Sequence, residues 1–336
     1  MIVAHAPGRV NLIGDHTDYT GGLVLPMAID LGTTVRGERT GDTVVLRSAD
    51  EAEVARVALD VAADESMRIA PSWARYVAGV VHETRPPVGF DGGVSTTLPI
   101  GAGLSSSAAL EVAVALALGF EGTALELALA CQRAEQVASG VPCGVMDQLA
   151  SAGGVDGHAL LIDCTSLTIE PVGLPDGVEV VVIHSGQERT LMGSAYAERR
   201  AACEAAAAVV GPLREATVDG LGVIVDEVTR ARARHVVTEN GRVRDFAAAL
   251  VAGDHSAAGA LMVASHASLR DDFEVSTPVL DALVDDLVAT SGVHGARLTG
   301  AGFGGCVVAL TDPGALPDRP SLWRVRAVGG ASVHES

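Results

Sequence analysis

The chain contains no lysine, and this absence is the first feature that limits its function. All 23 cationic residues are arginine, against 42 acidic ones, so the formal net charge is −19. A Walker-type phosphate loop needs a lysine to contact the terminal phosphates of a nucleotide, so the sequence excludes that loop. The strong negative charge also repels polyanions at long range, which argues against nucleic acid or an anionic membrane as a partner.

Paired cysteines and long apolar runs are also missing. The five cysteines are scattered, odd in number and never form a C-x-x-C pair, which disfavours a disulfide framework and a zinc site. No apolar stretch reaches the roughly 18 residues that a membrane span requires, and no basic segment followed by an apolar run opens the chain. We therefore expect a reduced, cytoplasmic protein. At 336 residues, it is long enough for about two domains without disulfides.

The apolar pattern predicts a mixed α and β protein. Strands are expected over residues 33–48, as a pair around a Thr-Gly-Asp turn, and in the runs "GGVSTTLP", "HALLIDC", "VEVVVIHSG" and "GGCVVALT". Helices are expected in "SWARYVAGVVHET", over residues 104–118 and 123–138, and in several segments after Tyr196.

The stretch "LPIGAGLSSSAALEVAVALAL", residues 98–118, has the pattern of a phosphate site. A strand ends at Pro99, a glycine-rich turn and three serines follow, and the chain then becomes strongly helix-forming. The first turn of a helix leaves N–H groups unpaired and carries positive partial charge, which suits a phosphate. Gly101 and Gly103 let the backbone approach an anion, and serines 105–107 can donate hydroxyls or bind a cation. The alternative is a plain serine N-cap after a turn.

Two further stretches are unusual. Residues 8–22, "GRVNLIGDHTDYTGG", place an arginine, an asparagine, two aspartates, a histidine and a tyrosine among glycines. They form either ordinary solvated surface or a ligand site. Residues 297–311, "RLTGAGFGGCVVALT", are so rich in glycine that we expect a close approach of the backbone to something else. That neighbour is either another packed segment or a nucleotide.

Two acidic residues are candidates for chemistry. Asp147 follows a Gly-Val-Pro-Cys-Gly turn and opens an expected short helix, where an anion is favoured. A helix-start aspartate is common without any function, but its neighbours Met146 and Leu149 indicate partial burial and favour a functional role. Glu135, near the end of the helix over 123–138, would by itself be a solvated charge.

Together these stretches resemble the galactokinases of the GHMP small-molecule kinase family. The segment "GRVNLIGDHTDY" resembles the galactokinase-specific N-terminal motif, "LPIGAGLSSSAAL" the family's phosphate loop, and "LTGAGFGGC" its C-terminal glycine motif. Further matches are "GVPCGVMDQLAS" and "SHASLRDDFEVSTPVLD". The similarity runs from about residue 4 to about residue 311, so it is more specific than any single glycine-rich loop.

The resemblance implies an α+β fold of two domains. The N-terminal domain, residues 1–172, is expected to resemble the second domain of ribosomal protein S5, and the C-terminal domain, residues 173–336, to be ferredoxin-like. The Pro and Gly content of "EPVGLPDG" favours this boundary. The active site is expected in the cleft between the domains.

The resemblance also implies an activity and its residues. The activity is phosphorylation of the anomeric hydroxyl of galactose by ATP, in galactose utilisation, with Mg²⁺ as the cofactor. Asp147 is the implied catalytic base and Arg9 the arginine beside it, while Ser107 and Glu135 are the implied Mg²⁺ ligands. The implied ATP-binding residues are Gly101, Ala102, Gly103, Leu104, Ser105, Ser106 and Ser107. The implied sugar-binding residues are Asp15, His16, Thr17, Asp18, Gly144 and Tyr196.

Two details modify this expectation. Asp15 stands where galactokinases usually have glutamate. If that carboxylate bonds a sugar hydroxyl directly, the shorter side chain costs roughly 1.5–3 kcal/mol unless water bridges the gap. An arginine beside Asp147 favours its charged form and makes it a weaker base, so Asp147 would orient the substrate more than abstract a proton.

Two alternative functions come with the family. One is a kinase of another galactose-like sugar, such as N-acetylgalactosamine. The other is a non-catalytic regulator that binds sugar and ATP, but such relatives lose residues of the serine loop, which is complete here. In each case the partners are small molecules, a hexose and ATP. We expect a monomer, with a weak dimer as the alternative.

Overall fold

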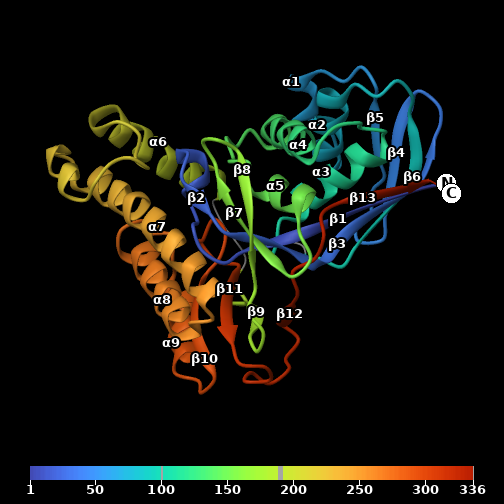
Figure 1. The fold of residues 1–336 in the computed structure, drawn as a ribbon. Coiled ribbons are helices and arrows are strands. Elements are labelled where there is room, and N and C mark those ends of the chain that lie inside the picture. Colours follow the sequence, from blue (N-terminus) through green and yellow to red (C-terminus); the bar gives the residue numbers. More distant parts are fainter. Residues whose placement is uncertain (100, 188–191, 336) are drawn as a thin grey trace.

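The computed structural model describes residues 1–99, 101–187 and 192–335, and its strands form three sheets (Figure 1). The largest has six strands in the order β13-β1-β3-β6-β4-β5. In it, β4 and β6 run parallel, whereas the other neighbours are antiparallel. These strands are β1 Ile2–Asn11, β3 Pro26–Arg39, β4 Thr43–Ser48, β5 Ala55–Ala58, β6 Phe90–Thr96 and β13 Ser332–Glu335.

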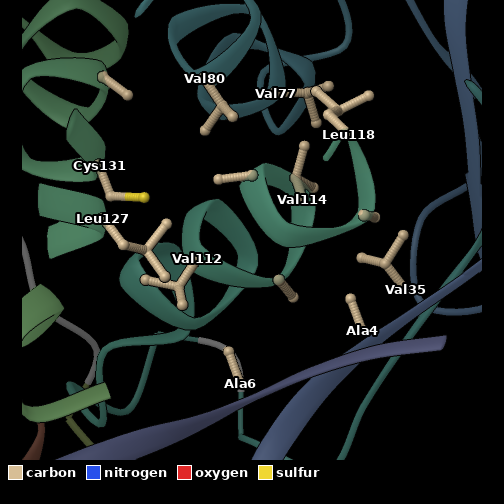
Figure 2. Close-up of a cluster of buried hydrophobic side chains, with 14 of the residues drawn as sticks. Ala4, Ala6, Val35, Val77, Val80, Val112, Val114, Leu118, Leu127 and Cys131 are labelled. Carbon is tan, nitrogen blue, oxygen red and sulfur yellow. The ribbon is translucent and has the colours of Figure 1, made fainter. Parts of the chain in front are cut away.

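Helices pack on one face of the six-stranded sheet and share a core with it (Figure 1). Figure 2 shows the α2 and α3 side chains Val77, Val80 and Val112 in the same buried cluster as Ala4 and Val35 of the sheet. Alanines fill much of α3, which favours the helix and lets it lie close to its neighbours. These helices are α1 Ala63–Ser66, α2 Ala74–Thr84, α3 Ser106–Ala117, α4 Ala124–Ser139 and α5 Met146–Gly153.

The second half of the chain builds a four-stranded sheet, in the order β10-β11-β9-β12, with long helices beside it (Figure 1). Its strands are β9 Glu179–His184, β10 Val293–Leu298, β11 Cys306–Thr311 and β12 Leu322–Val325. The helices are α6 Met192–Val210, α7 Glu227–Ala252, α8 His255–Asp271 and α9 Pro278–Val288, with short 3-10 turns η1 Asp18–Thr20 and η2 Asp219–Val223. A third sheet joins β2 Leu23–Val24, β7 His158–Asp163 and β8 Thr168–Gly173.

One core connects the two halves. Alternate residues of β9 point to opposite faces, as strand geometry requires. Val181 and Ile183 enter a core with α8 and α9, whereas Val180 and Val182 enter a second core. That second core also contains Leu12, which directly follows β1. The N-terminal motif is therefore held against the C-terminal sheet by buried apolar contacts.

The mixed α and β architecture predicted from the sequence is confirmed. The two strands expected over 33–48 are parts of β3 and β4, which do not pair because β6 lies between them, and the helices expected over 104–118 and 123–138 are α3 and α4. The division between residues 172 and 173 stays a prediction; β8 crosses that point, and β13 returns from the end of the chain to pair with β1. Within the described part of the chain, no helix has the length and apolar character needed to cross a bilayer.

The contact between α8 and β10 generates a prediction about stability. A Cβ added at Gly259 of α8 would lie 1.9 Å from the carbonyl oxygen of His294, a backbone atom that cannot move aside cheaply. We expect Gly259→Ala to lower the free energy of unfolding by about 1–3 kcal/mol or more, measured by urea denaturation.

Gly241 of α7 is the matched control, because a Cβ there meets nothing within 4 Å. Gly241→Ala should raise stability by about 0.5–1 kcal/mol, since alanine lowers the entropy cost of the helix. Equal effects of the two substitutions would contradict the close packing of α8 on β10.

Candidate active site

A cavity of about 980 Å³ lies where the N-terminal motif, the glycine–serine loop and the C-terminal glycine motif meet. These segments are far apart in the sequence, and the cavity brings them onto one surface. Its walls include Arg9 of β1, Ser105 to Ser107 before and at the start of α3, Glu135 of α4, Asp147 of α5 and Gly300 of the glycine motif. The three stretches that the sequence marked as unusual therefore belong to one site.

Arg9 and Asp147 form a bidentate ion pair in the wall of this cavity. The Arg9 Nε donates to Asp147 Oδ1 at 2.8 Å, and Nη2 donates to Oδ2 at 2.6 Å. The third nitrogen, Nη1, donates to the Gly103 carbonyl at 2.8 Å, which ties the pair to the phosphate loop. The Arg9 side chain is 6% exposed and that of Asp147 27%, so the carboxylate keeps one side open to the cavity. A planar fork of this kind fixes the orientation of the carboxylate.

The glycine–serine loop uses positive φ angles at Gly101 (+76°), Gly103 (+84°) and Ser105 (+58°). Glycine adopts such angles without strain, whereas a serine adopts them at a cost. Although Ser105 is the N-cap of α3, its side chain makes no capping bond and donates instead to Asp147 Oδ2. The plain serine N-cap that the sequence left open is therefore not what this loop forms.

Not every residue expected in the loop reaches the cavity. Ala102 and Leu104 are buried in the hydrophobic core and do not line it, so their side chains anchor the loop. The lining residues are Gly101, Gly103, Ser105, Ser106 and Ser107. Alternation of buried and lining residues is the local reason that the loop presents its backbone and its hydroxyls to the same side.

Glu135 lies beside Ser107, as expected for a shared cation site. The Ser107 hydroxyl donates to Glu135 Oε1 at 2.9 Å, and the Gln148 amide donates to Oε2 at 2.5 Å. Burial, together with the charge of Asp147, raises the pKa of Glu135 to about 7. A bound cation would compensate this buried charge, and carboxylate and hydroxyl oxygens are ligands that Mg²⁺ accepts. In the described residues no group of three or more His, Cys, Asp or Glu side chains forms a metal site.

Asp18 and Gly144 are in close contact in the cavity wall. A Cβ at Gly144 would lie 1.9 Å from Asp18 Oδ2, so only glycine leaves room for this carboxylate. Burial and the nearby charge of Asp147 raise the pKa of Asp18 to about 7. Tyr196 of α6 also lines the cavity. These three expected sugar residues are brought together.

His16 lines the cavity, but both of its ring nitrogens have hydrogen-bond partners within the protein. Its φ is +66°, its Nδ1 lies 3.0 Å from the Tyr19 hydroxyl and its Nε2 lies 3.2 Å from the Ala301 carbonyl. Because a carbonyl only accepts, Nε2 carries the hydrogen and Nδ1 accepts from Tyr19. Burial lowers the pKa of His16 to about 3, so the ring is neutral. The His16 ring also packs near the Tyr196 ring, with 5.7 Å between the two ring centroids.

Asp15 and Thr17 have partners within the protein. The Asp15 carboxylate accepts from Arg297 Nη2 at 2.6 Å and from the Gly300 N–H at 3.0 Å, and it lines the cavity while almost fully buried. The Thr17 hydroxyl lies 2.7 Å and 2.6 Å from two backbone carbonyls and does not line the cavity. Asp15 thus links the N-terminal motif to the glycine motif, and Thr17 shapes the turn.

Sequence reasoning missed the apolar end of the cavity. Trp73 and Tyr76, at the start of α2, line it together with Met67 and with Val94 of β6. The sequence of this region predicted a helix, but helical spacing alone cannot show which aromatic side chains face a distant strand. An aromatic and apolar wall of this kind suits the flat face of a nucleobase.

The charges around the cavity are strongly unbalanced. Carboxylates from six lining residues face only two guanidinium groups, Arg9 and Arg75, in the part of the wall that the structure describes. The lining carboxylates are those of Asp15, Asp18, Asp50, Glu51, Glu135 and Asp147. A bare polyphosphate would be repelled here, so an anionic nucleotide needs a cation with it.

Family models match three parts of the chain. Residues 1–39 match the galactokinase galactose-binding signature, residues 73–154 the GHMP kinases N terminal domain, and residues 246–319 the GHMP kinases C terminal model. A crystal structure of mevalonate kinase shares the fold, with a TM-score of 0.66 at 21% identity over 97% of this chain and 99% of that one. The fold and the site thus define a GHMP kinase.

Closer relatives narrow the class. The chain is 45% identical to the galactokinase of Homo sapiens over 94% of its length and 85% of the relative's, and 46% identical to that of Roseiflexus sp. (strain RS-1) over 93% and 83%. A crystal structure of Lactococcus lactis galactokinase complexed with galactose superposes with a TM-score of 0.90 at 32% identity, covering 98% of this chain and 95% of that one. The chain belongs to the galactokinase family.

The buried pair between Asp15 and Arg297 generates a prediction. The two side chains are 2% and 0% exposed, so removal of the carboxylate leaves an uncompensated guanidinium in the interior. We expect Asp15→Ala to lower the free energy of unfolding by about 3–5 kcal/mol in a denaturant titration.

The control is the surface pair of Asp30 and Arg326, whose arginine is 83% exposed. Asp30→Ala should cost about 0–1 kcal/mol, because solvent screens that pair. A similarly small loss for Asp15→Ala would refute a structural role for the buried pair.

Proposed function

We propose that this chain transfers the γ-phosphoryl group of ATP to the anomeric hydroxyl of galactose, giving galactose 1-phosphate and ADP. One observation carries the proposal: the carboxylate of Asp147, fixed by Arg9, opens into the same cavity as the serine loop and Asp18. The 32% identical galactokinase complexed with galactose supports the choice of sugar.

The sugar is proposed to bind at the end formed by Asp18, Gly144 and Tyr196, with His16 and Asp15 behind it. Recognition of several neighbouring hydroxyls needs donors and acceptors fixed in place. Asp18 supplies an acceptor with room beside Gly144, and the Tyr196 ring lies against His16. Since the Thr17 hydroxyl makes its hydrogen bonds to backbone carbonyls, its proposed contribution is to shape the turn.

ATP is proposed to lie between the serine loop and the aromatic wall. Its phosphates would meet the backbone of residues 101–107 at the start of α3, and its base would lie near Trp73 and Tyr76. Ser107 and Glu135 are proposed to hold Mg²⁺, because their paired oxygens and the buried charge of Glu135 fit that ion. When bound, the cation supplies charge neutralisation for the phosphates in a cavity that has no lysine.

The reaction is an in-line displacement. The anomeric oxygen forms a bond to the γ-phosphorus while the bond from phosphorus to the β,γ-bridging oxygen breaks, and ADP leaves with that electron pair. The hydroxyl proton passes to the open side of the Asp147 carboxylate. Because Arg9 and Ser105 both donate to this carboxylate and fix its direction, its main proposed contribution is to orient the hydroxyl.

A panel of free sugars tests the function. We expect ADP release from Mg-ATP with galactose to exceed that with N-acetylgalactosamine, glucose or no sugar. Asp147→Asn should lower kcat with galactose by about 10²–10⁴-fold while leaving ATP affinity nearly unchanged, because the residue contacts the hydroxyl and not the nucleotide.

Asp285→Asn, on the exposed surface of α9, is the matched control and should leave kcat unchanged. A preference for another sugar would replace galactose in the proposal. The absence of turnover with every sugar would indicate a binding regulator, and an unaltered kcat in Asp147→Asn would remove that residue from the mechanism.

The raised pKa of Asp18, about 7, generates a pH prediction. As the pH falls below this pKa, Asp18 becomes protonated in the empty site. Sugar binding then weakens, because only the ionised carboxylate accepts hydrogen bonds on both oxygens. From the ionised fraction, the Kd for galactose should rise by about tenfold between pH 8 and pH 6, measured by calorimetry. Asp18→Asn should bind more weakly and lose this dependence. A wild-type Kd that stays constant over this range would contradict the prediction.

A further inference from the structure

Three helices meet behind the expected cation site and bury a polar cluster there. Glu111 lies on α3, one helical turn beyond Ser107; Glu135 lies on α4 and Gln148 on α5. Glu111 and Gln148 are both 0% exposed. Neither Glu111 nor Gln148 lines the cavity, so neither has contact with a substrate there.

A single amide group connects the two glutamates. The Gln148 Nε2 donates to Glu135 Oε2 at 2.5 Å and to Glu111 Oε2 at 3.2 Å. The two amide hydrogens of Gln148 are therefore donated to two different carboxyl groups. Two other atoms of the cluster, Glu111 Oε1 and Gln148 Oε1, are buried and have no hydrogen-bond partner among the described residues.

Both unpartnered atoms would be acceptors if Glu111 were ionised. A buried acceptor without a partner is costly, and a buried carboxylate with one amide hydrogen is more costly still. Protonation of Glu111 on Oε1 removes both problems, because the new O–H can donate to Gln148 Oε1 while the amide N–H donates to Glu111 Oε2.

We propose that Glu111 is a neutral carboxylic acid in a closed, doubly hydrogen-bonded pair with the Gln148 amide, and that this pair positions Glu135. The pair fixes which end of the amide faces Glu135. Its N–H group, and not its carbonyl oxygen, then meets Glu135 Oε2, while Ser107 holds Oε1. The carboxylate is thereby oriented before any cation binds.

This inference rests on the proposed role of Glu135 in binding the cation. Residues that hold a metal ligand in place commonly change metal affinity by about 10–100-fold when they are removed. Glu111 and Gln148 are positioning residues in this sense, since they act through Glu135.

The first measurement concerns the protonation state. Infrared difference spectra between the wild-type protein and Glu111→Gln should contain the carbonyl stretch of a protonated carboxyl group, shifted in deuterium oxide. If only carboxylate bands are lost, Glu111 is ionised and the proposal is overturned.

The second measurement is Mn²⁺ affinity in the presence of saturating ADP and no sugar, followed by the electron paramagnetic resonance of free Mn²⁺. Glu111→Leu cannot form the pair and should weaken Mn²⁺ binding by about 10–100-fold. Glu111→Gln can form an equivalent amide pair, so its affinity should stay within about threefold of the wild type. Gln148→Ala removes the pair from the other side and should behave like Glu111→Leu, which keeps the test valid if the leucine variant does not fold.

Val114→Ala is the control for packing, because Val114 is buried on the same helix but does not belong to the polar cluster. It should lower stability and leave Mn²⁺ affinity unchanged. Equal weakening by Glu111→Gln and Glu111→Leu would mean that a charge is required, and no weakening by Glu111→Leu would mean that the pair positions nothing; either result overturns the inference.

Glu135→Gln separates this inference from the proposed cation site. If it weakens Mn²⁺ binding and Glu111→Leu does not, the cation site stands and the inference fails alone. If Glu135→Gln leaves Mn²⁺ affinity unchanged, the assignment of Glu135 as a ligand fails, and the positioning role falls with it.

Discussion

The ion pair between Arg9 and Asp147 is the contact on which the site depends. It joins the first strand to the start of α5, and the third nitrogen of Arg9 extends the connection to the carbonyl of Gly103. One guanidinium thereby connects the Asp147 carboxylate, the proposed proton acceptor, to the glycine–serine loop proposed to bind phosphate. Because the guanidinium is planar and binds both carboxylate oxygens, it holds the Asp147 carboxylate in one orientation. Ser105 adds a third hydrogen bond to the same carboxylate, in a backbone conformation that costs energy.

The cavity solves the problem of binding a polyphosphate with an acidic protein. Glycine φ angles and a helix start present backbone N–H groups, so no lysine is needed. The rest of the described wall is rich in carboxylates, which is why a cation is proposed to bind together with the nucleotide. Glu135 shows the effect of this negative wall. Its buried carboxylate accepts hydrogen bonds from Ser107 and Gln148, and its pKa rises to about 7 in the absence of a cation.

Local patterns predicted helices and strands, whereas the candidate site residues came from the resemblance to the galactokinase family. The alanine-rich run after the serines became α3, and Arg9, Ser107, Glu135 and Asp147 were expected to share a site and line one cavity. Motif matching gives no side-chain directions. Thr17 belongs to the sugar motif, yet its hydroxyl turns to backbone carbonyls, because a tight turn must satisfy its own polar groups. The pairing of Asp15 with Arg297 joins residues 282 positions apart, and no local rule connects them.

The sequence by itself determined the family, since the motifs within residues 8–22, 98–118 and 297–311 occur together and in this order, and the absence of lysine excluded a Walker-type loop. Tertiary structure alone decided which groups are charged and which are free to act. The neutral ring of His16, the raised pKa of Asp18 and the unpartnered oxygens of Glu111 and Gln148 all follow from burial and from neighbours on other elements. Desolvation and Coulomb forces depend on distances through space, and a sequence does not contain those distances until the chain has folded.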